Sequence, residues 1–309
     1  MRSVLLIGNG INLSFSDTKD KVCDLLSGKN NPNSDTIKIP KGVHVPFPLE
    51  VVIQTRDQVD LLMKNCSADL WGEVKTGSEQ YDFYRRILNL PCEDILTSNY
   101  GFQLEETAYD TEIISKYKVG NITHFIKGRG RDRAESSLFT YTYQSAGEKY
   151  NNKRLWHIHG HAKNPSSMVI GHGYYGRLLY KLIDYVKDND GRYRFGLNDI
   201  PEIRSWIDSF LFGDVYVLGF GFGFAEMDLW WLLDQKKNGN YGREMGKLYF
   251  YEPSNQNASD DFIKYEMLKS YGAEVLNLGV TVTHENEKYV YKEFYLKAIN
   301  DIEERISNQ

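Results

Sequence analysis

Short apolar runs alternate with longer segments of helical periodicity along this chain. Glycine or polar residues follow at once after four of the runs, which lie at 3–7, 94–98, 155–159 and 214–218. Apolar runs of this length, bounded by turn residues, are typical of buried strands. In an open parallel sheet, the residues just past the carboxyl ends of the strands meet in one crevice, where ligands bind. We therefore expect these four segments to share one edge of a sheet.

The alternation of strand and helix patterns predicts an α/β fold, with a Rossmann-like, mostly parallel sheet and helices on both faces. Further strands are expected at 122–126, 137–143, 168–171, 247–252 and 274–278. Helices are expected over 48–63, 78–90, 177–186, 201–212, 228–235, 259–271 and 292–306. We expect a single domain over residues 1–309, with a helical insertion at about 15–90 and a segment at about 173–208 that could act as a lid.

The charge balance argues against one class of function. A formal net charge of −5 over 309 residues gives no broad basic field, so sequence-independent binding to nucleic acid is not favoured. One basic cluster lies at 127–133. A solvated glycine-rich loop explains this cluster, and contact with a partner or a phosphate is the alternative.

Composition also limits the cellular location that we expect for the protein. The hydrophobic content of 41% and the charged content of 26% are typical of a soluble globular protein. No apolar run reaches the ~18 residues that a membrane-spanning helix needs. The three cysteines are isolated and include no Cys-x-x-Cys pair, so neither a disulfide framework nor a zinc ribbon is encoded. A cytoplasmic location is therefore expected, without a membrane partner.

The first apolar run leads into Gly8, Asn9 and Gly10. Glycines allow the backbone to approach a pyrophosphate, and a helix that follows offers unpaired N–H donors. A full dinucleotide fingerprint has a third glycine where this chain has Leu13. A tight turn with a purely structural role is therefore an equal alternative for these glycines.

A second glycine segment, 219–223, follows the last of the four runs, and Glu226 and Asp228 come next. The glycines could line a nucleotide crevice. Acidic residues in the first turn of a helix also interact favourably with its dipole, which is the plain explanation for both carboxylates. Asn99, at the end of another run, could cap the helical stretch that follows or orient a ribose hydroxyl or a water.

His157, His159 and His161 alternate, so a strand that continued through them would point all three to one face. A metal cluster is one interpretation, but no acid or cysteine spacing matches it, and no metal is expected. A buried structural histidine is the plain alternative. A histidine at the end of a strand is also a natural general base near neutral pH.

Taken together, the four segments resemble the sirtuin-like superfamily, in its bacterial branch of zinc-less, NAD-hydrolysing antiviral effectors, and they are also similar to the abortive-infection AbiH family. The resemblance runs from residue 4 to about residue 235. It rests on the order of four motifs, which are Gly8-Asn9-Gly10-Ile11-Asn12, Thr97-Ser98-Asn99-Tyr100, Ile158-His159-Gly160 and Gly221-Phe-Gly-Phe-Ala-Glu226-Met-Asp228.

The resemblance implies an NAD+ hydrolase that cleaves NAD+ to nicotinamide and ADP-ribose in anti-phage abortive infection. It implies His159 and Asn99 as catalytic residues and NAD+ as the substrate, without a metal. The residues implied in binding the dinucleotide are Gly8, Asn9, Gly10, Asn12, Tyr100, Gly221, Gly223 and Asp228. Regulation by a homo-oligomer or by a partner protein is expected as well, because an enzyme that depletes NAD+ is toxic to its own cell unless it is controlled.

Three departures from the family pattern bear on nucleotide contacts. Gly101 replaces the usual Asp, Asn12 occupies a position that is often Ser or Asp, and Gly223 occupies a position that is often Ser. Three scattered cysteines cannot form the four-cysteine zinc module of the deacetylase branch, so deacetylation is not expected. Two other functions stay open. One is a module that senses NAD or ADP-ribose and signals to a partner without cleaving it. The other is a toxin that acts on nucleic acid, against which the acidic charge argues.

Overall fold

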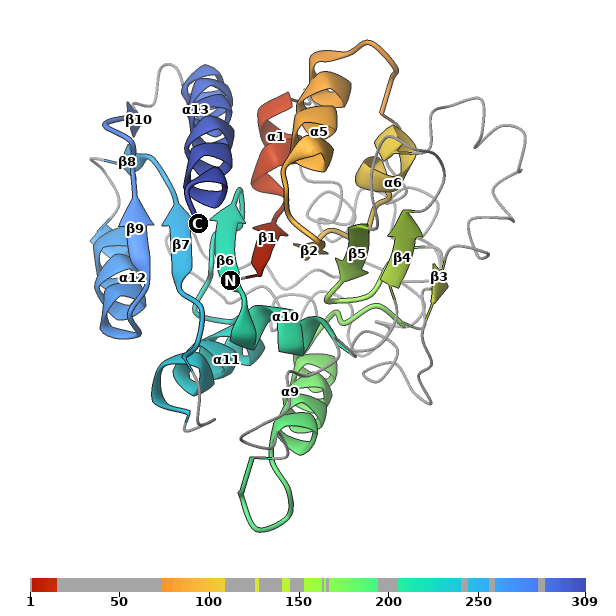
Figure 1. Ribbon diagram of the computed structural model, residues 1–309, viewed down its shortest axis with the longest axis vertical. Helices are drawn as coiled ribbons and strands as arrows, with labels where there is room; N and C mark the ends of the chain where they lie inside the picture. The colour runs from red at the N-terminus through yellow and green to blue at the C-terminus, as the bar shows by residue number, and fades with distance from the viewer. Residues whose placement is uncertain are drawn as a thin grey trace, which may run out of the picture.

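A computed structural model describes residues 2–15, 74–108, 126–127, 141–144, 153–162, 164, 167–193, 205–239, 244–255, 259–282 and 287–309. The described residues form one large sheet with helices on both faces (Figure 1). Most of the expected helical insertion, including the predicted helix over 48–63, lies outside the described residues, and so does the basic cluster apart from Lys127.

Eight strands form the main sheet in the order β3-β4-β5-β2-β1-β6-β7-β9. Six of them, from β5 to β9 in that order, are parallel, and β4 and β3 are added antiparallel at one edge. This confirms the predicted α/β Rossmann-like fold. The strands are β1 (Ser3–Ile7), β2 (Asp94–Thr97), β3 (Ile126–Lys127), β4 (Tyr141–Gln144), β5 (Lys153–His157), β6 (Asp214–Leu218), β7 (Leu248–Tyr251) and β9 (Glu274–Leu276), with β8 (Ser254–Asn255) and β10 (Thr281–Val282) in a separate pair.

The strand order reverses beside β1. From β1 the chain continues to β2 and β5 on one side, and then to β6, β7 and β9 on the other. The point between β1 and β6 is therefore the topological switch point, where open α/β sheets bind ligands. The strand ends are level across it, because Ile7 pairs with both Thr97 and Leu218, and Thr97 pairs with His157.

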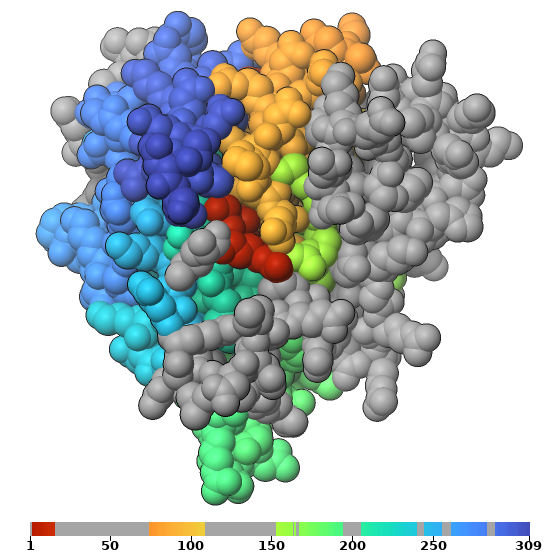
Figure 2. All heavy atoms as spheres, in the orientation of Figure 1, coloured from red at the N-terminus to blue at the C-terminus, as the bar shows by residue number. Residues whose placement is uncertain are grey.

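The alternation of side chains along the strands creates two cores, one on each face. In β1, Val4 and Leu6 belong to the core beneath α9 (His172–Val186), α10 (Trp206–Phe212), α11 (Met227–Asn238) and α12 (Ser259–Ser270). Leu5 and Ile7 belong to the core beneath α1 (Gly10–Phe15), α5 (Glu79–Asn89), α6 (Gln103–Ala108) and α13 (Glu287–Ser307). In the space-filling view, α13 and the orange segment that contains α5 cover much of one face, with red N-terminal residues visible between them (Figure 2).

Capping side chains explain where two of the helices begin. The hydroxyl of Ser78 accepts a hydrogen bond from the Tyr81 N–H (3.2 Å), which satisfies a free donor at the start of α5. Ser205 and Asp208 form a reciprocal capping box at the start of α10. None of the helices in the described ranges is long and apolar enough to cross a membrane.

Two expected strands differ from the structure. Residues 168–170, expected as part of a strand over 168–171, are not a strand, because Gly171 (φ +84°) turns the chain directly into α9. The strand expected over 155–159 begins earlier and ends at His157. Gly160 (φ +80°) closes a turn there by donating its N–H to the His157 carbonyl (3.0 Å).

The segment expected to act as a lid begins as a packed helix. One side of α9 is buried against the sheet through Tyr175, Leu178, Leu182 and Val186. Residues 194–204 of that segment lie outside the described residues, so the lid stays a prediction.

A buried lysine fastens the end of α10 to α11. The ammonium group of Lys236 donates to the carbonyls of Phe210 (2.7 Å), Leu211 (3.0 Å) and Gly213 (2.6 Å). The last carbonyls of a helix have no partner within the helix, so this one side chain satisfies groups that would otherwise be buried without hydrogen bonds.

We expect Lys236→Ala to lower the free energy of unfolding by about 2–4 kcal/mol, because it leaves three buried carbonyls unpaired. Its neighbour Lys237 is exposed, and its ammonium group donates to the Ser270 carbonyl. Lys237→Ala should therefore change stability by less than about 0.5 kcal/mol. Urea unfolding of the two variants measures the difference, and equal losses would contradict the role given to Lys236.

Candidate functional site

The four segments singled out in the sequence do meet along one edge of the sheet. The level register of β1, β2, β5 and β6 places the residues that follow Ile7, Thr97, His157 and Leu218 side by side. The candidate site therefore spans the switch point, as expected for a fold of this class.

The glycine turns after β1 and β6 pack directly against each other. Gly8 donates its N–H to the Leu218 carbonyl (3.1 Å), and Gly10 donates to the Gly219 carbonyl (2.9 Å). A Cβ atom on Gly8 would lie 2.5 Å from the Gly219 oxygen, and one on Gly10 would lie 2.8 Å from it. Close approach of two backbones therefore requires these glycines. Their own N–H groups are already used, so only the N–H groups after them are left for a pyrophosphate, and its binding at this turn stays a prediction.

Asn12 connects two helices. Its Oδ1 accepts hydrogen bonds from Gln80 Nε2 (2.9 Å) and from the Tyr84 hydroxyl (2.6 Å), both on α5. Its Nδ2 donates to Oδ1 of Asn9 (3.1 Å). Both asparagine side chains have structural partners, and Asn12 holds α1 against α5, so binding of a nucleotide by Asn9 and Asn12 stays a prediction.

The loop after β6 is open where it carries Gly221 and Gly223. No atom of the described residues lies within 4 Å of the position that a Cβ would take on either glycine. Phe222 between them is buried and has φ +48°, a conformation that costs free energy for a residue with a Cβ. Edge-on contacts with the rings of Phe220 and Trp230 hold it there. These two glycines therefore border free space, unlike Gly8 and Gly10.

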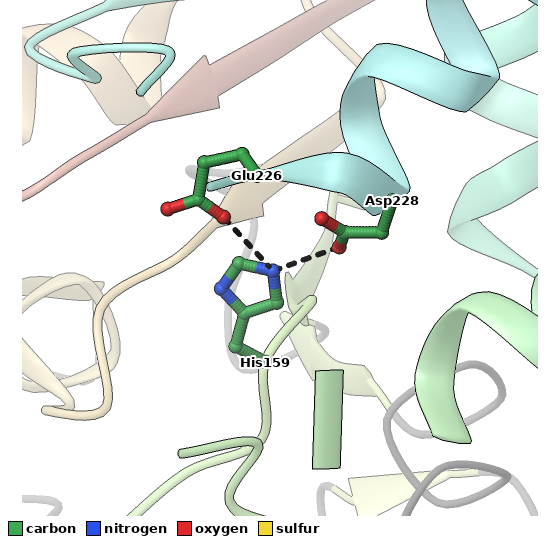
Figure 3. A group of neighbouring side chains, drawn as sticks. All are labelled: His159, Glu226 and Asp228. Carbon is green, nitrogen blue, oxygen red and sulfur yellow. Dashed lines mark hydrogen bonds and ion pairs between the residues drawn. The ribbon is translucent and has the colours of Figure 1, made fainter. Parts of the chain in front are cut away.

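His159 meets two carboxylates at the start of α11 (Figure 3). Its Nε2 lies 2.9 Å from Oδ2 of Asp228 and 3.7 Å from Oε2 of Glu226. His159 and Asp228 are only 2% and 0% exposed. The chain positions the imidazole by the turn that ends β5, and it positions both acids by the beginning of the helix that follows β6.

Burial and charge act in opposite directions on this group. Burial alone would lower the pKa of the His159 imidazole, but the attraction and hydrogen bond of Asp228, together with Glu226, raise it above the ordinary value of 6.5. Burial, with a smaller contribution from Asp228, raises the pKa of Glu226 to about 7 against the opposing effects of His159 and of the hydrogen bond from Tyr175. Tyr175 on α9 donates its hydroxyl hydrogen bond to Glu226, and its ring packs edge-on against His159, with centroids 5.1 Å apart.

Two carboxylate oxygens of this group have no hydrogen-bond partner among the described atoms, Asp228 Oδ1 and Glu226 Oε2. One nitrogen of His159 and one oxygen of each acid lie within 4.8 Å of one another, a spacing that a divalent cation could bridge if it replaced the Nε2 proton. The sequence predicted no metal on the ground that no acid was suitably spaced. That ground is wrong, because the fold brings both acids to His159 from a distant segment.

The three alternating histidines do not share one face, because the strand ends at His157. His157 turns to the other side, where its Nδ1 lies 2.8 Å from the Asn99 carbonyl oxygen and its Nε2 lies 2.9 Å from Glu105 Oε1. The ring of His161 lies 5.6 Å from that of His157 and packs against Phe102. The prediction that one strand would present all three rings together is therefore wrong.

Asn99 and His159 lie in the loops that follow the neighbouring strands β2 and β5, each two residues past the pair Thr97 and His157. The side chain of Asn99 is partly buried and makes no hydrogen bond to any described residue. It does not cap the helix that follows, which was one alternative for it. The hydroxyl of Tyr100 donates to the Val169 carbonyl (3.0 Å) and thereby ties this loop to the segment before α9.

Three residues of the site were not expected as members from the sequence. Glu226 was explained by the helix dipole, although it stands two residues before Asp228. Tyr175 and Glu105 come from helices whose contact with the sheet edge depends on tertiary packing. For these two residues, spacing and local periodicity contain no signal of the contact.

Comparison with known proteins adds no relative on which to base an assignment. No protein-family model matches this chain. A search of curated proteins found no match either. The function therefore has to be argued from the sequence motifs and from the geometry of the sheet edge.

Proposed function

We propose that this protein hydrolyses NAD+ to nicotinamide and ADP-ribose. The observation that supports this proposal best is the hydrogen-bonded pair of His159 and Asp228 at the carboxyl edge of the sheet. His159 follows β5, and Asn99 follows the neighbouring strand β2. A buried imidazole held by a carboxylate is a suitable general base, and this edge is where the fold class binds nucleotides.

The proposed reaction breaks the bond between C1′ of the ribose and the nicotinamide nitrogen. The bonding electron pair leaves with that nitrogen, so nicotinamide departs as a neutral molecule and needs no general acid. The ribose gains oxocarbenium character, as in glycoside hydrolysis. A water oxygen then forms the new bond to C1′, and its proton passes to Nδ1 of His159.

Asp228 determines which nitrogen of His159 can act as the base. Because its Oδ2 accepts a hydrogen bond from Nε2, the ring has its proton on Nε2 and a lone pair on Nδ1. The same carboxylate stabilises the imidazolium that forms when Nδ1 accepts a proton. Nδ1 itself has no hydrogen-bond partner within the described ranges, so it is free for a water or a ribose hydroxyl.

Asn99 and the second glycine loop complete the proposed site. The carboxamide of Asn99 can donate and accept at once, which suits it to orient a water or a ribose hydroxyl. Gly221 and Gly223 border open space, so we assign the close approach of the dinucleotide to this loop. The turn at Gly8 and Gly10 contributes its shape, since its N–H groups bond the β6 loop.

The biological setting belongs to the proposal as well and is supported by the sequence resemblance alone. We propose a cytoplasmic role in anti-phage abortive infection, in which depletion of NAD+ stops growth of the infected cell. Control by a homo-oligomer or a partner protein completes this proposal, because uncontrolled hydrolysis would harm the host.

One observation favours a second candidate. Only 2% of His159 is exposed, so a dinucleotide reaches the ring only when part of the surrounding chain moves. A module that binds NAD or ADP-ribose and signals to a partner performs no catalysis, so it would not need an accessible His159 ring. A rise in melting temperature with NAD+ but no release of nicotinamide would select this sensor.

We expect His159→Ala and Asn99→Ala to lower nicotinamide release by about 10²–10⁴-fold, the usual contribution of a general base or of its positioning. His172 and Asn89 are exposed, so His172→Ala and Asn89→Ala serve as matched controls and should keep full activity. Nicotinamide is followed by chromatography after incubation of the purified protein with NAD+.

Full activity in both site variants would overturn the assignment. The same assay with a chelator separates the two interpretations of the carboxylates. Activity that vanishes with EDTA and returns with Mn²⁺ would replace the imidazole base with a metal centre, whereas unchanged activity supports the histidine and aspartate pair.

The pH dependence should report the environment of the base. Activity requires neutral His159, so it should be lost as pH falls through the raised pKa, with a midpoint above 6.5. Asp228→Asn removes the largest effect that raises this pKa and leaves burial, which lowers it, so the midpoint should move to lower pH. Glu226 titrates nearby, and Glu226→Gln shows whether it contributes. A midpoint that Asp228→Asn does not move would contradict the pair.

A further inference from the structure

We propose that His157 and Glu105 form a buried clamp on the main chain of Asn99, which makes His157 a positioning residue for the proposed reaction. The inference rests on the proposed function, because it concerns how Asn99 is held beside the reacting atoms. It uses the histidine that the catalytic argument leaves without a role.

Two short hydrogen bonds define the clamp. Nδ1 of His157 lies 2.8 Å from the carbonyl oxygen of Asn99, and Nε2 lies 2.9 Å from Oε1 of Glu105. A carbonyl oxygen can only accept, so the proton on Nδ1 is fixed by the geometry. The carboxyl group of Glu105 forms the second hydrogen bond, with Nε2, and so holds the opposite side of the ring.

The clamp continues the connection between β2 and β5 beyond the last bond of the strands. Ile158 donates its N–H to the Thr97 carbonyl (3.0 Å), and there the regular ladder ends. Two residues further on, the carbonyl of Asn99 receives its hydrogen bond from the side chain of His157. The loop therefore keeps a fixed distance from β5 where the catalytic segment begins.

A buried ion pair is a costly way to hold a loop. His157 and Glu105 are only 3% and 1% exposed, and apolar residues of similar size often stabilise a core equally well. What an apolar pair cannot supply is a donor for the Asn99 carbonyl. The chemistry of the pair is therefore suited to orienting one peptide group rather than to filling space.

The orientation of the Asn99 main chain determines where its side-chain carboxamide points. The side chain of Asn99 has no hydrogen bond to the described part of the chain, so its direction depends on its own main chain. If the peptide rotates, the carboxamide changes direction and no longer orients the water or ribose hydroxyl that we assign to it. A misplacement of about 1 Å at a reacting centre can lower a rate by about 10²-fold.

Two substitutions of His157 separate the two hydrogen bonds. In His157→Asn, the side-chain nitrogen lies near the place of Nδ1 and can still donate to Asn99. In His157→Gln, it lies near the place of Nε2 and can reach Glu105 but not Asn99. Both variants remove the buried ring, so both should lower the melting temperature by similar amounts.

We expect His157→Gln to lower kcat by about 10–10²-fold with little change in KM for NAD+, and His157→Asn to stay within about 3-fold of the unchanged protein. Equal losses of kcat in the two variants, in proportion to their stability, would overturn the clamp, because a merely structural histidine makes no distinction between them.

Resonances of labelled protein test the clamp without any reference to activity. The ring of His157 should show a protonated Nδ1 that is protected from exchange, and the main-chain carbonyl carbon of Asn99 should shift in His157→Gln but not in His157→Asn. An unprotonated Nδ1, or equal shifts in both variants, would overturn the clamp. If the unchanged protein releases no nicotinamide while these resonances agree, the proposed function fails and the clamp stands.

Discussion

The hydrogen-bond register among β5, β2, β1 and β6 is the constraint on which the candidate site depends. Parallel strands that end level bring together residues that are far apart in the chain, such as His159 and Asp228. A shift of one residue in any strand would turn its side chains to the opposite face. The two cores, with Val4 and Leu5 on different faces, oppose such a shift, so the packing of the sheet also fixes the site.

The electrostatics of the site follow from burial. One imidazole and two carboxylates share a place with little water, where charges interact more strongly than at the surface. Asp228 keeps His159 protonated on Nε2, and burial raises the pKa of Glu226 to about 7, so this carboxyl group changes its charge near neutral pH. His157 and Glu105 form a second pair on the other side of the same turn. The two histidines therefore differ in their carboxylate partners, and we propose different roles for them, a base for His159 and a positioning residue for His157.

Much of the fold could be predicted from the sequence, because apolar runs and glycine turns are local signals. The edge shared by Asn99 and His159 followed from those runs and from the general geometry of parallel sheets. The partners of the histidines could not be predicted, since Glu105 and Tyr175 reach the site only through packing of α6 and α9. The roles of Gly8 and Gly10 were also beyond reach, because a turn against a backbone and a turn against a ligand require the same residue.

The contact between the turns after β1 and β6 has a mechanical consequence. Gly8, Gly10 and Gly219 leave no room for a side chain between the two backbones, and two peptide hydrogen bonds cross the seam. This contact therefore joins the part of the sheet that ends at β1 firmly to the part that begins at β6. A movement of the loop that carries Gly221 would be transmitted through this contact to α1 and, through Asn12, to α5, which covers the same face of the sheet.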